Sequence, residues 1–416
     1  MRVLIINTSE TTGGAAIAAS RLTNALNRHG MKARMLVRDK QTDRVTTCVV
    51  PQRWRLKLAF LWERLCIWTA NRFRRQGLWE VDIANAGADI TRLPEFLEAD
   101  IIHLHWVNQG FLSLRQLDKL LHSGKHIVWT MHDMWPCTGI CHHARACDRY
   151  QTHCHDCPQL LHPAARDLSY QTFARKLRAY AQSTIAFVAC SEWLATAARQ
   201  SALLCGQQVT AIPNTYDGQL FRPASKKAAR QLLSLPENRH LLLFACQKVT
   251  NARKGIDILL EALASPRLRG WSRQLTLVVV GELSERVTRD VPFAVRPMGY
   301  IHDEARMAAL YQAVDVFVTP SLEENLPNTI MEAMACGTPC VGFSIGGIPE
   351  MIDHEVNGYV ARYRDADDLA AGIDYVLSDE DHRLSQAAAS KAASSWNEEA
   401  VVHQYIGLYE KNYFKL

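Results

Sequence analysis

Short, nearly continuous apolar segments alternate with amphipathic stretches along the first half of the chain. The segment "RVLIIN" (2–7) is one example, and such a run is typical of a strand that is covered on both faces. Strands are expected at 2–7, 33–37, 100–104, 126–130, 185–190 and 208–212. Helices are expected at 15–29, 113–123, 170–182 and 192–201. Strands that alternate with helices favour a parallel sheet with helices on both faces.

The same alternation restarts in the second half of the chain. Strands are expected there at 240–246, 274–281, 314–320 and 339–343. Helices are expected at 255–264, 303–313, 328–336 and 366–378. Residues 213–230 are rich in turn formers and mark a boundary, and 416 residues exceed one ordinary core. We therefore predict two doubly wound, Rossmann-like α/β domains, residues 1–215 and 222–395, which face each other across a cleft.

The composition excludes several classes of protein. Charged residues make up 21% and hydrophobic residues 48% of the chain, which is ordinary for a globular protein. A net charge of +5 is too small to indicate a nucleic-acid partner. The start "MRVLIINTSE" lacks the pattern of a signal peptide, and no apolar run approaches the ~18–20 residues of a membrane span. A cytoplasmic protein is expected.

Residues 50–79 depart from the α/β pattern. This segment carries seven Arg or Lys residues against one Glu, a net charge of +6, and four tryptophans. A basic amphipathic helix with aromatic residues suits the surface of an anionic membrane. Two interpretations stay open: peripheral contact with the cytoplasmic face of the inner membrane, or packing of the helix on its own domain.

Residues 320–350, "PSLEENLPNTIMEAMACGTPCVGFSIGGIPE", carry the most chemical information. A polar loop is expected after a strand, followed by a helix with Pro327 near its first turn and Gly337 at its end. Loops at the carboxyl ends of parallel strands bind ligands, and the start of a helix favours a pyrophosphate. Glu324 and Glu332 can accept hydrogen bonds from sugar hydroxyls at such a place.

The Glu324–Glu332 spacing, followed by "AMACGTP" and "GGIPE", resembles the signature of the retaining glycosyltransferases of family 4. The resemblance extends over essentially the whole chain. It implies the GT-B fold, with an acceptor-binding first domain, a nucleotide-sugar-binding second domain and a C-terminal helix, 396–416, that returns to the first domain. The "ENLP" sequence, where "EGFG" is usual, resembles a bacterial subgroup that builds surface polysaccharides.

The resemblance assigns residues to the donor. Glu332 is expected to bind the ribose, Glu324 to contact the donor sugar, and the backbone amides of Asn325 and Leu326 to lie near the pyrophosphate or sugar.

A basic group at the donor is also implied. The pair Lys254-Gly255 resembles the "KG" of the family, in which a lysine and an arginine hold the diphosphate and offset the charge of the leaving group. Lys248 or Arg253 is expected to take the place of that arginine. Glu324 and Lys254 are therefore expected to be catalytic as well as donor-binding.

Three further features belong to the first domain. Gly13 and Gly14 follow the first strand, where backbone and helix start can approach an anionic group. His132 matches the family's histidine near the reacting sugar and is expected to be catalytic. His105 is expected, with Trp106, to shape the acceptor pocket, and burial of the tryptophan is the alternative.

The loop at 137–158 contains "CHHARACDRYQTHCHDCP". Cys141, Cys147, Cys154 and Cys157 match cysteines of the recognised subgroup, and four thiolates would close a structural zinc shell. Disulfides and unliganded thiols are the alternatives. Four histidines of this loop, with Cys137, are expected to be reserve ligands or surface groups: His142, His143, His153 and His155.

The resemblance implies transfer of a sugar from a UDP- or GDP-sugar to a hydroxyl of a glycan. A polyprenyl-diphosphate-linked acceptor is expected, in biosynthesis of a capsule, exopolysaccharide or O-antigen-type polymer. No Asp-x-Asp motif occurs in the donor region, so no cofactor is expected to be required for catalysis. The alternatives are a sugar-nucleotide epimerase, a phosphorylase and a non-catalytic scaffold of the same fold.

Overall fold

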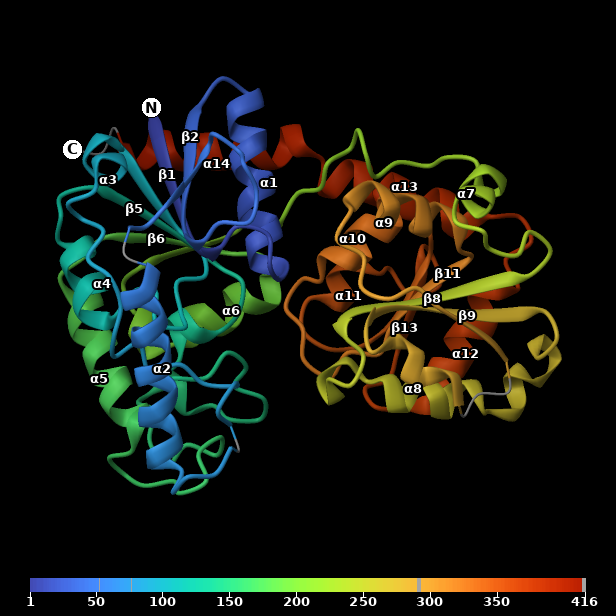
Figure 1. Cartoon of the computed structure of the whole chain (residues 1–416), viewed down its shortest axis with the longest axis horizontal. Coiled ribbons are helices and arrows are strands. Elements are labelled where there is room, and N and C mark those ends of the chain that lie inside the picture. Colours follow the sequence, from blue (N-terminus) through green and yellow to red (C-terminus); the bar gives the residue numbers. More distant parts are fainter. Residues whose placement is uncertain (52, 76, 290–292, 414–416) are drawn as a thin grey trace. The chain divides into compact units, whose positions relative to one another are not determined.

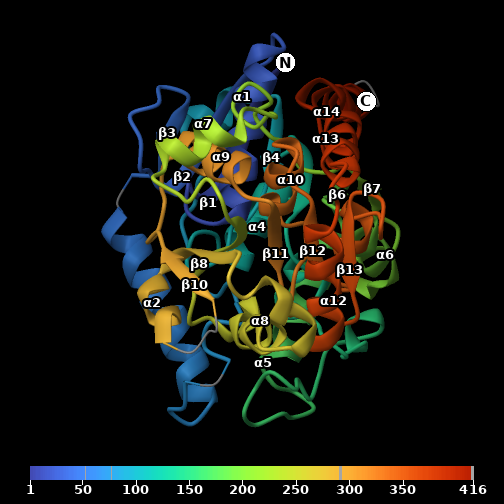
Figure 2. The same cartoon turned by 90° about the vertical axis from the view of Figure 1, so that its right-hand side faces the viewer.

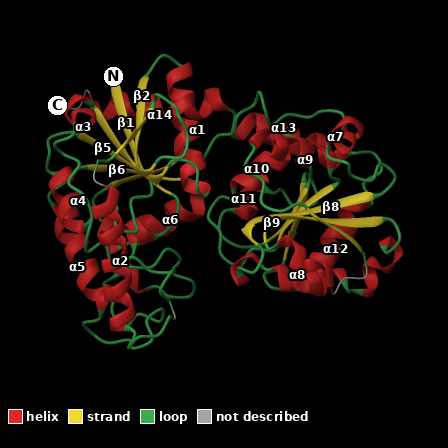
Figure 3. Cartoon of the chain, in the orientation of Figure 1, coloured by secondary structure: helices red, strands yellow, loops and turns green. Residues whose placement is uncertain are grey.

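The computed structural model describes residues 1–51, 53–75, 77–289 and 293–413. The chain forms two compact units. One contains Met1–Pro213 and the segment from Val401 onward, and the other contains Asn214–Ala400. Each unit is built on a parallel sheet (Figure 1), with helices on both faces of the sheet (Figure 3). The predicted architecture of two parallel α/β domains is confirmed.

The first unit contains a seven-stranded sheet in the order β3-β2-β1-β4-β5-β6-β7, in which every pair is parallel. The strands are β1 (Arg2–Ser9), β2 (Lys32–Asp39), β3 (Thr47–Val49), β4 (Ile101–Leu104), β5 (His126–Met131), β6 (Ile185–Ala189) and β7 (Gln208–Ala211). The helices are α1 (Gly14–Arg28), α2 (Arg53–Ala70), α3 (Pro94–Glu98), α4 (Leu114–Leu121), α5 (Leu168–Ala181), α6 (Glu192–Gln200) and α14 (Glu398–Tyr413).

Strand β1 shows how the core of this unit is divided. Val3 and Ile5 pack into a cluster with α1 and α14, whereas Leu4 and Ile6 pack into a cluster that includes α4 and α5. Successive side chains of a strand point to opposite faces. Both faces of β1 are therefore covered, which explains its continuous apolar sequence.

Helix α14 packs on the sheet of the first unit. Its residues Val401, Val402, Tyr405, Leu408 and Tyr409 are buried in the same cluster as Val3 and Ile5. These positions recur with helical spacing, so one face of the helix enters the core. The helix starts at Glu398, two residues after the predicted start, and residues 414–416 of the prediction lie outside the described residues.

The second unit contains a six-stranded parallel sheet in the order β10-β9-β8-β11-β12-β13. Figure 2 shows β8, β11, β12 and β13 in this order. The strands are β8 (His240–Lys248), β9 (Leu275–Glu282), β10 (Ala294–Pro297), β11 (Val316–Thr319), β12 (Cys340–Phe343) and β13 (Gly358–Ala361). The helices are α7 (Lys226–Leu232), α8 (Ile256–Leu263), α9 (Glu304–Ala313), α10 (Asn328–Ala335), α11 (Ile348–Met351), α12 (Ala366–Leu377) and α13 (Arg383–Ser395).

Sequence reasoning missed the strands β3, β10 and β13. Each lies at a sheet edge and has only three or four residues. Such short runs carry little periodicity, and β10 ends in a proline, which sheets tolerate at edges. Of the basic segment 50–79, Arg53–Ala70 forms helix α2, and residues 52 and 76 lie outside the described residues.

The strand orders define where ligands can bind. In the first sheet the order reverses between β1 and β4, and in the second it reverses between β8 and β11. Open parallel sheets bind ligands beyond the carboxyl ends of the strands at such points. Among the described residues, no helix has the length and apolar character needed to cross a membrane.

Candidate functional site

Two predicted catalytic residues meet at the reversal point of the second sheet. Lys254 follows β8 and Glu324 follows β11, the neighbouring strand. The Lys254 ammonium forms an ion pair and hydrogen bond with Oε1 of Glu324. The side chains are 32% and 15% exposed, so a ligand can reach this pair. The structure therefore joins the two halves of the predicted donor site.

Two glycines bring the backbone close to the Glu324 loop. Gly255 has φ 71°, and a Cβ there would lie 1.9 Å from the carbonyl oxygen of Pro320. Gly346 has φ 57°, and its Cβ would lie 1.9 Å from the carbonyl oxygen of Glu324. The backbone amide of Gly347, the next residue, donates a hydrogen bond of 2.7 Å to the backbone carbonyl oxygen of Asn325. A side chain at either glycine would displace the loop that carries Glu324.

Three other predicted donor residues lie on or just before α10. Asn325, Leu326 and Glu332 are all at most 9% exposed. Oε2 of Glu332 accepts a hydrogen bond of 3.1 Å from the hydroxyl of Tyr311. Burial, and then the neighbouring Glu332, raise the pKa of Tyr311, so that hydroxyl stays a donor. Binding of ribose by Glu332 stays a prediction.

The second basic group of the donor site has two candidates. Arg253 lies next to Lys254, and its guanidinium is 3.6 Å from Oε2 of Glu323. Lys248 is exposed at the end of β8. Both are close in sequence to the reversal point, so the choice between them stays open.

Predicted residues of the first unit gather at the carboxyl ends of β1, β4 and β5. Gly13, with φ 90°, precedes the first residue of α1, Gly14. The Thr8 amide donates to the Trp106 carbonyl oxygen at 2.8 Å, which joins the end of β1 to the loop after β4. His105 follows β4 and is 3% exposed. This edge is the reversal point of the first sheet.

Two histidines form a pair at this edge. Nδ1 of His105 lies 2.8 Å from Nε2 of His132, and Nδ1 of His132 lies 3.6 Å from the Cys190 sulfur. Burial lowers the pKa of His132 to about 4, against the opposing effect of Asp133. Burial, and then neighbouring His103 and His132, lower the pKa of His105 well below its usual value. Both rings are therefore neutral at pH 7.

The histidine pair limits what His132 can do. Both of its ring nitrogens contact groups of its own unit, so a sugar can reach its side chain only by displacing one contact. Contact through the His132 backbone needs no such change. Among the described residues, Nε2 of His105 is buried without a hydrogen-bond partner. A buried polar atom of this kind normally has a partner, such as water or ligand.

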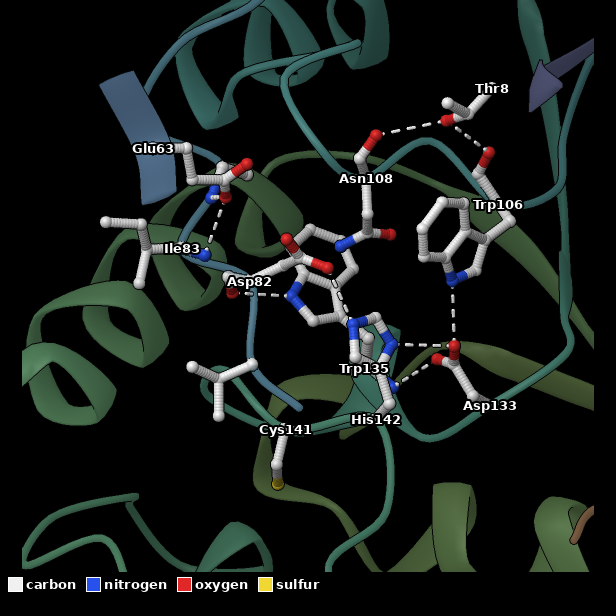
Figure 4. A network of polar contacts seen from close by, with 12 residues as sticks. Thr8, Glu63, Asp82, Ile83, Trp106, Asn108, Asp133, Trp135, Cys141 and His142 are labelled. Atoms are coloured by element: carbon white, nitrogen blue, oxygen red, sulfur yellow. Dashed lines mark hydrogen bonds and ion pairs between the residues drawn. The ribbon is translucent and has the colours of Figure 1, made fainter. Parts of the chain in front are cut away.

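A buried network lies beside this pair (Figure 4). His142 donates from Nδ1 to Asp133 and from Nε2 to Asp82, both at 2.7 Å. Burial alone would lower the pKa of His142, but Asp133 and then Asp82 raise it to about 10. Asp133 also accepts a 2.9 Å hydrogen bond from the indole of Trp106. An imidazolium that is charged at pH 7 thus links the cysteine-rich loop to Asp133, the residue that follows His132.

The network continues into helix α2. Asp82 forms an ion pair with Arg64, and Arg64 lies 3.5 Å from Oε2 of Glu63. Oε1 of Glu63 accepts from the amides of Ile83 and Ala84 at 2.8 and 2.6 Å. Burial, and then Asp82, raise the pKa of Glu63 to about 7.

Sequence reasoning missed this network and treated His142 as a reserve metal ligand or surface group. That interpretation is wrong for His142, because it is 12% exposed and both of its nitrogens donate to carboxylates. The sequence contains only a weak indication of this network. Asp82, Asp133 and His142 come from separate segments, and nothing in their spacing pairs them.

The four predicted zinc ligands line one small cavity. Cys141, Cys147, Cys154 and Cys157 surround a volume of about 20 Å³, which is enough for one water-sized occupant. The Cys154 sulfur accepts a hydrogen bond of 3.3 Å from the Gly139 amide. All twelve cysteines of the chain are free thiols in the structure.

The cavity is not a ready metal site. Among the described residues, no group of three or more His, Cys, Asp or Glu side chains could hold a metal ion as it stands. Burial raises the pKa of Cys154 to about 12 and of Cys157 to about 11, so these thiols are protonated at pH 7. Zinc would have to displace these protons and draw the sulfurs together. The zinc site stays a prediction.

Metal analysis tests that prediction. Protein purified without chelators is expected to contain about one zinc per chain. Replacing Cys154 and Cys157 by serine should release it, whereas serine at the exposed Cys205 should not. Zinc-free wild-type protein whose four thiols all react freely with a thiol reagent would contradict the site.

Two protein families match the chain. The family described as Glycosyltransferase Family 4 matches residues 12–219, which is half of the chain, and Glycosyl transferases group 1 matches residues 239–379. The first match covers most of the first unit, and the second covers the sheet of the second unit.

Individual relatives agree with these matches. A D-inositol 3-phosphate glycosyltransferase of Xylanimonas cellulosilytica is 31% identical in an alignment of 212 positions that covers 46% of this chain and 49% of that protein. The chain thus spans about half the length of the curated relatives that it matches.

Two solved structures share the fold over nearly the whole chain. Sucrose-phosphate synthase from Thermosynechococcus elongatus has 19% identity and a TM-score of 0.67, covering 99% of this chain and 98% of that one. Alr3699/HepE of Anabaena, in complex with UDP-glucose, has 18% identity and a TM-score of 0.64, covering 99% and 100%.

Proposed function

Because this chain belongs to glycosyltransferase family 4, we propose that it transfers a sugar from a nucleotide-sugar donor to a hydroxyl of a glycan acceptor. The proposed donor is a UDP- or GDP-sugar. The proposed acceptor is linked to polyprenyl diphosphate, and the product contributes to a surface polysaccharide. The anomeric configuration is retained.

The observation that carries this proposal is the Lys254–Glu324 ion pair at the reversal point of the second sheet. Without donor, each charge neutralises the other. When a nucleotide sugar binds, the diphosphate takes the ammonium of Lys254, and Glu324 is released to accept hydrogen bonds from the sugar hydroxyls. We expect side-chain rotation to suffice for this exchange, because the backbone at Gly255 already lies close to Pro320, at the start of the loop that carries Glu324.

The proposed reaction breaks the bond between the sugar C1 and the diphosphate oxygen, and forms a bond between C1 and the acceptor oxygen. The acceptor hydroxyl loses its proton to the departing nucleoside diphosphate. Lys254, with Arg253 or Lys248, offsets the negative charge that grows on this leaving group. His132 contributes a neutral contact to the sugar, since its pKa of about 4 keeps it uncharged at pH 7.

The acceptor is proposed to bind at the edge formed by Gly13, Gly14 and His105. The buried Nε2 of His105 supports this role, because an acceptor hydroxyl or a water molecule would supply its missing hydrogen bond. The β1–β4 reversal point supports it too, because ligands of parallel sheets bind there.

Product analysis tests the function. Purified protein is incubated with single UDP- and GDP-sugars, with UDP-glucose first because Alr3699/HepE was solved with it. Acceptors are a polyprenyl-diphosphate-linked sugar and, because of the curated relatives, D-inositol 3-phosphate. Mass spectrometry is expected to show one added sugar on the lipid-linked acceptor, and nuclear magnetic resonance to show the donor's anomeric configuration.

The same experiment separates the alternatives. Isomerised donor without acceptor would indicate an epimerase, and release of sugar 1-phosphate in the presence of phosphate would indicate a phosphorylase. No turnover with any pair, together with no nucleotide binding, would favour a scaffold. Transfer to D-inositol 3-phosphate alone would preserve the reaction class and overturn the proposed acceptor.

A further inference from the structure

Helix α2 exposes an apolar face. Six of its side chains are between 36% and 60% exposed: Trp54, Leu58, Leu61, Trp62, Leu65 and Trp68. At the angular spacing of an α-helix, these six positions fall within an arc of about 120°. Phe73, 63% exposed, continues this surface beyond the helix, because its ring centre lies 4.8 Å from that of Trp68. Contiguous exposed patches of this kind mark interaction sites.

The opposite face of α2 already serves its own unit. Leu56 and Ile67 are buried in the core, and Glu63 and Arg64 are buried in the ion-pair network. Packing on its own unit, one of the two sequence-based interpretations, therefore accounts for this inner face and leaves the outer apolar face unexplained. Figure 1 shows α2 as a long helix on the outside of the first unit.

The exposed charges of residues 53–75 are all positive. Arg53, Arg55 and Lys57 lie in the first turns of α2, and Arg72, Arg74 and Arg75 follow its end. All six are exposed, whereas Glu63, the acidic residue of this stretch, is buried. The described part of 53–75 thus presents six cations and no carboxylate to solvent. The Arg55 guanidinium lies 5.2 Å from the centre of the Trp54 ring.

We propose that α2 docks in the surface of an anionic bilayer. The helix lies in the plane of the interface, its leucines enter the boundary between headgroups and acyl chains, and the tryptophans lie at headgroup level. The six cations contact lipid phosphates. A protein partner or second copy would also cover the apolar face, but exposed cations at both ends of that face, with no exposed carboxylate in residues 53–75, fit an anionic surface better. The proposal goes beyond the transfer reaction and does not depend on it.

Co-sedimentation with vesicles tests the apolar part of the proposal. The full chain is mixed with vesicles of phosphatidylcholine, or of phosphatidylcholine with phosphatidylglycerol, without donor or acceptor. Wild type is expected to bind the anionic vesicles. The double variant Leu61→Asp/Leu65→Asp is expected to bind at least about tenfold more weakly, because two apolar side chains that would enter the bilayer become charged. Leu232→Asp, at a 75% exposed leucine of α7, is the matched control.

A second set of variants tests the charges. The triple variant Arg53→Gln/Arg55→Gln/Lys57→Gln is expected to lose about 100-fold in affinity for anionic vesicles, and high salt should weaken wild type. The control removes three exposed arginines of the second unit by changing Arg267, Arg269 and Arg273 to Gln.

Three results would overturn the proposal. One is equal binding to neutral and anionic vesicles, and another is unchanged binding of the Leu61/Leu65 variant. The third is a wild-type protein that does not bind vesicles and is a dimer in light scattering, whereas the Leu61/Leu65 variant is a monomer. This result would identify a second copy as the occupant. Circular dichroism and thermal unfolding check that each variant is folded. If Leu61→Asp/Leu65→Asp is misfolded, Leu58→Gln/Leu65→Gln is tested in its place.

Discussion

Replacing Lys254 by alanine is expected to reduce turnover by at least about tenfold, and the loss of a single transition-state charge contact can reach about 100- to 1,000-fold. Lys254 is the ammonium that the second unit presents beside Glu324. The variant is expected to bind the free nucleoside diphosphate more weakly, because one cation at the diphosphate is gone. The side chain is partly exposed, so the protein should stay folded.

Glu324→Gln is expected to separate turnover from nucleotide binding. Turnover should also fall at least about tenfold, because the sugar loses a charged hydrogen-bond acceptor. Binding of the free nucleoside diphosphate should be equal to wild type or tighter, because Lys254 no longer has to leave an ion pair. The two variants of one ion pair are therefore expected to differ in nucleotide binding, which only Lys254→Ala should weaken.

Steady-state kinetics and titration calorimetry check both variants. Lys227→Ala, at a 74% exposed lysine of the same unit, is the control and should behave like wild type. Wild-type turnover in either folded variant would remove that residue from the donor site. Weaker nucleotide binding in Glu324→Gln would contradict the proposed exchange of partners.

His142→Gln is expected to destabilise the first unit by roughly 3–5 kcal/mol, because it leaves two buried carboxylates without their shared cation. Asp82 would keep Arg64, whereas Asp133 would keep the Trp106 indole and the Trp135 amide. Equilibrium unfolding by denaturant measures the loss. His162→Gln is the control at an exposed histidine.

The pH dependence identifies the charge of His142. Its pKa in the folded chain, about 10, lies above the usual 6.5, so its contribution to stability is complete below about pH 6.5 and is lost as the pH rises through 10. The difference in free energy of unfolding between wild type and His142→Gln should therefore shrink between about pH 7.5 and 10. Glu63, with a pKa of about 7, titrates largely below this window. A difference independent of pH would mean that His142 acts as a neutral ring.

Much of the fold could be predicted because local patterns of apolar and polar residues indicate its strands and helices. The apolar segments around Leu4 and Leu242 are typical of strands buried on both faces, and each is followed by a helical stretch. The edge strand β13 (Gly358–Ala361) could not be predicted in this way. Its identity depends on pairing with β12, which is a contact between distant residues.

The candidate site also has a part that local sequence predicts and a part that depends on contacts between distant residues. Lys254 and Glu324 were predicted from their local motifs, and the structure adds that they form an ion pair. His132 was predicted from its match to the family's histidine, but its contacts with His105 and Cys190 depend on the order of β4, β5 and β6 in the sheet.

The sequence by itself determined the two parallel α/β units and the motifs of the donor loop, because strands, helices and loop–helix junctions depend on residues close together in the chain. Only the tertiary structure decided that His142 is a buried cation between Asp82 and Asp133, since its pKa depends on how the loop folds back on Asp133 and on Asp82 from a distant segment. It also decided which face of α2 is exposed. Both faces of that helix are rich in apolar residues, and only the packing of the first unit selects the one that it covers.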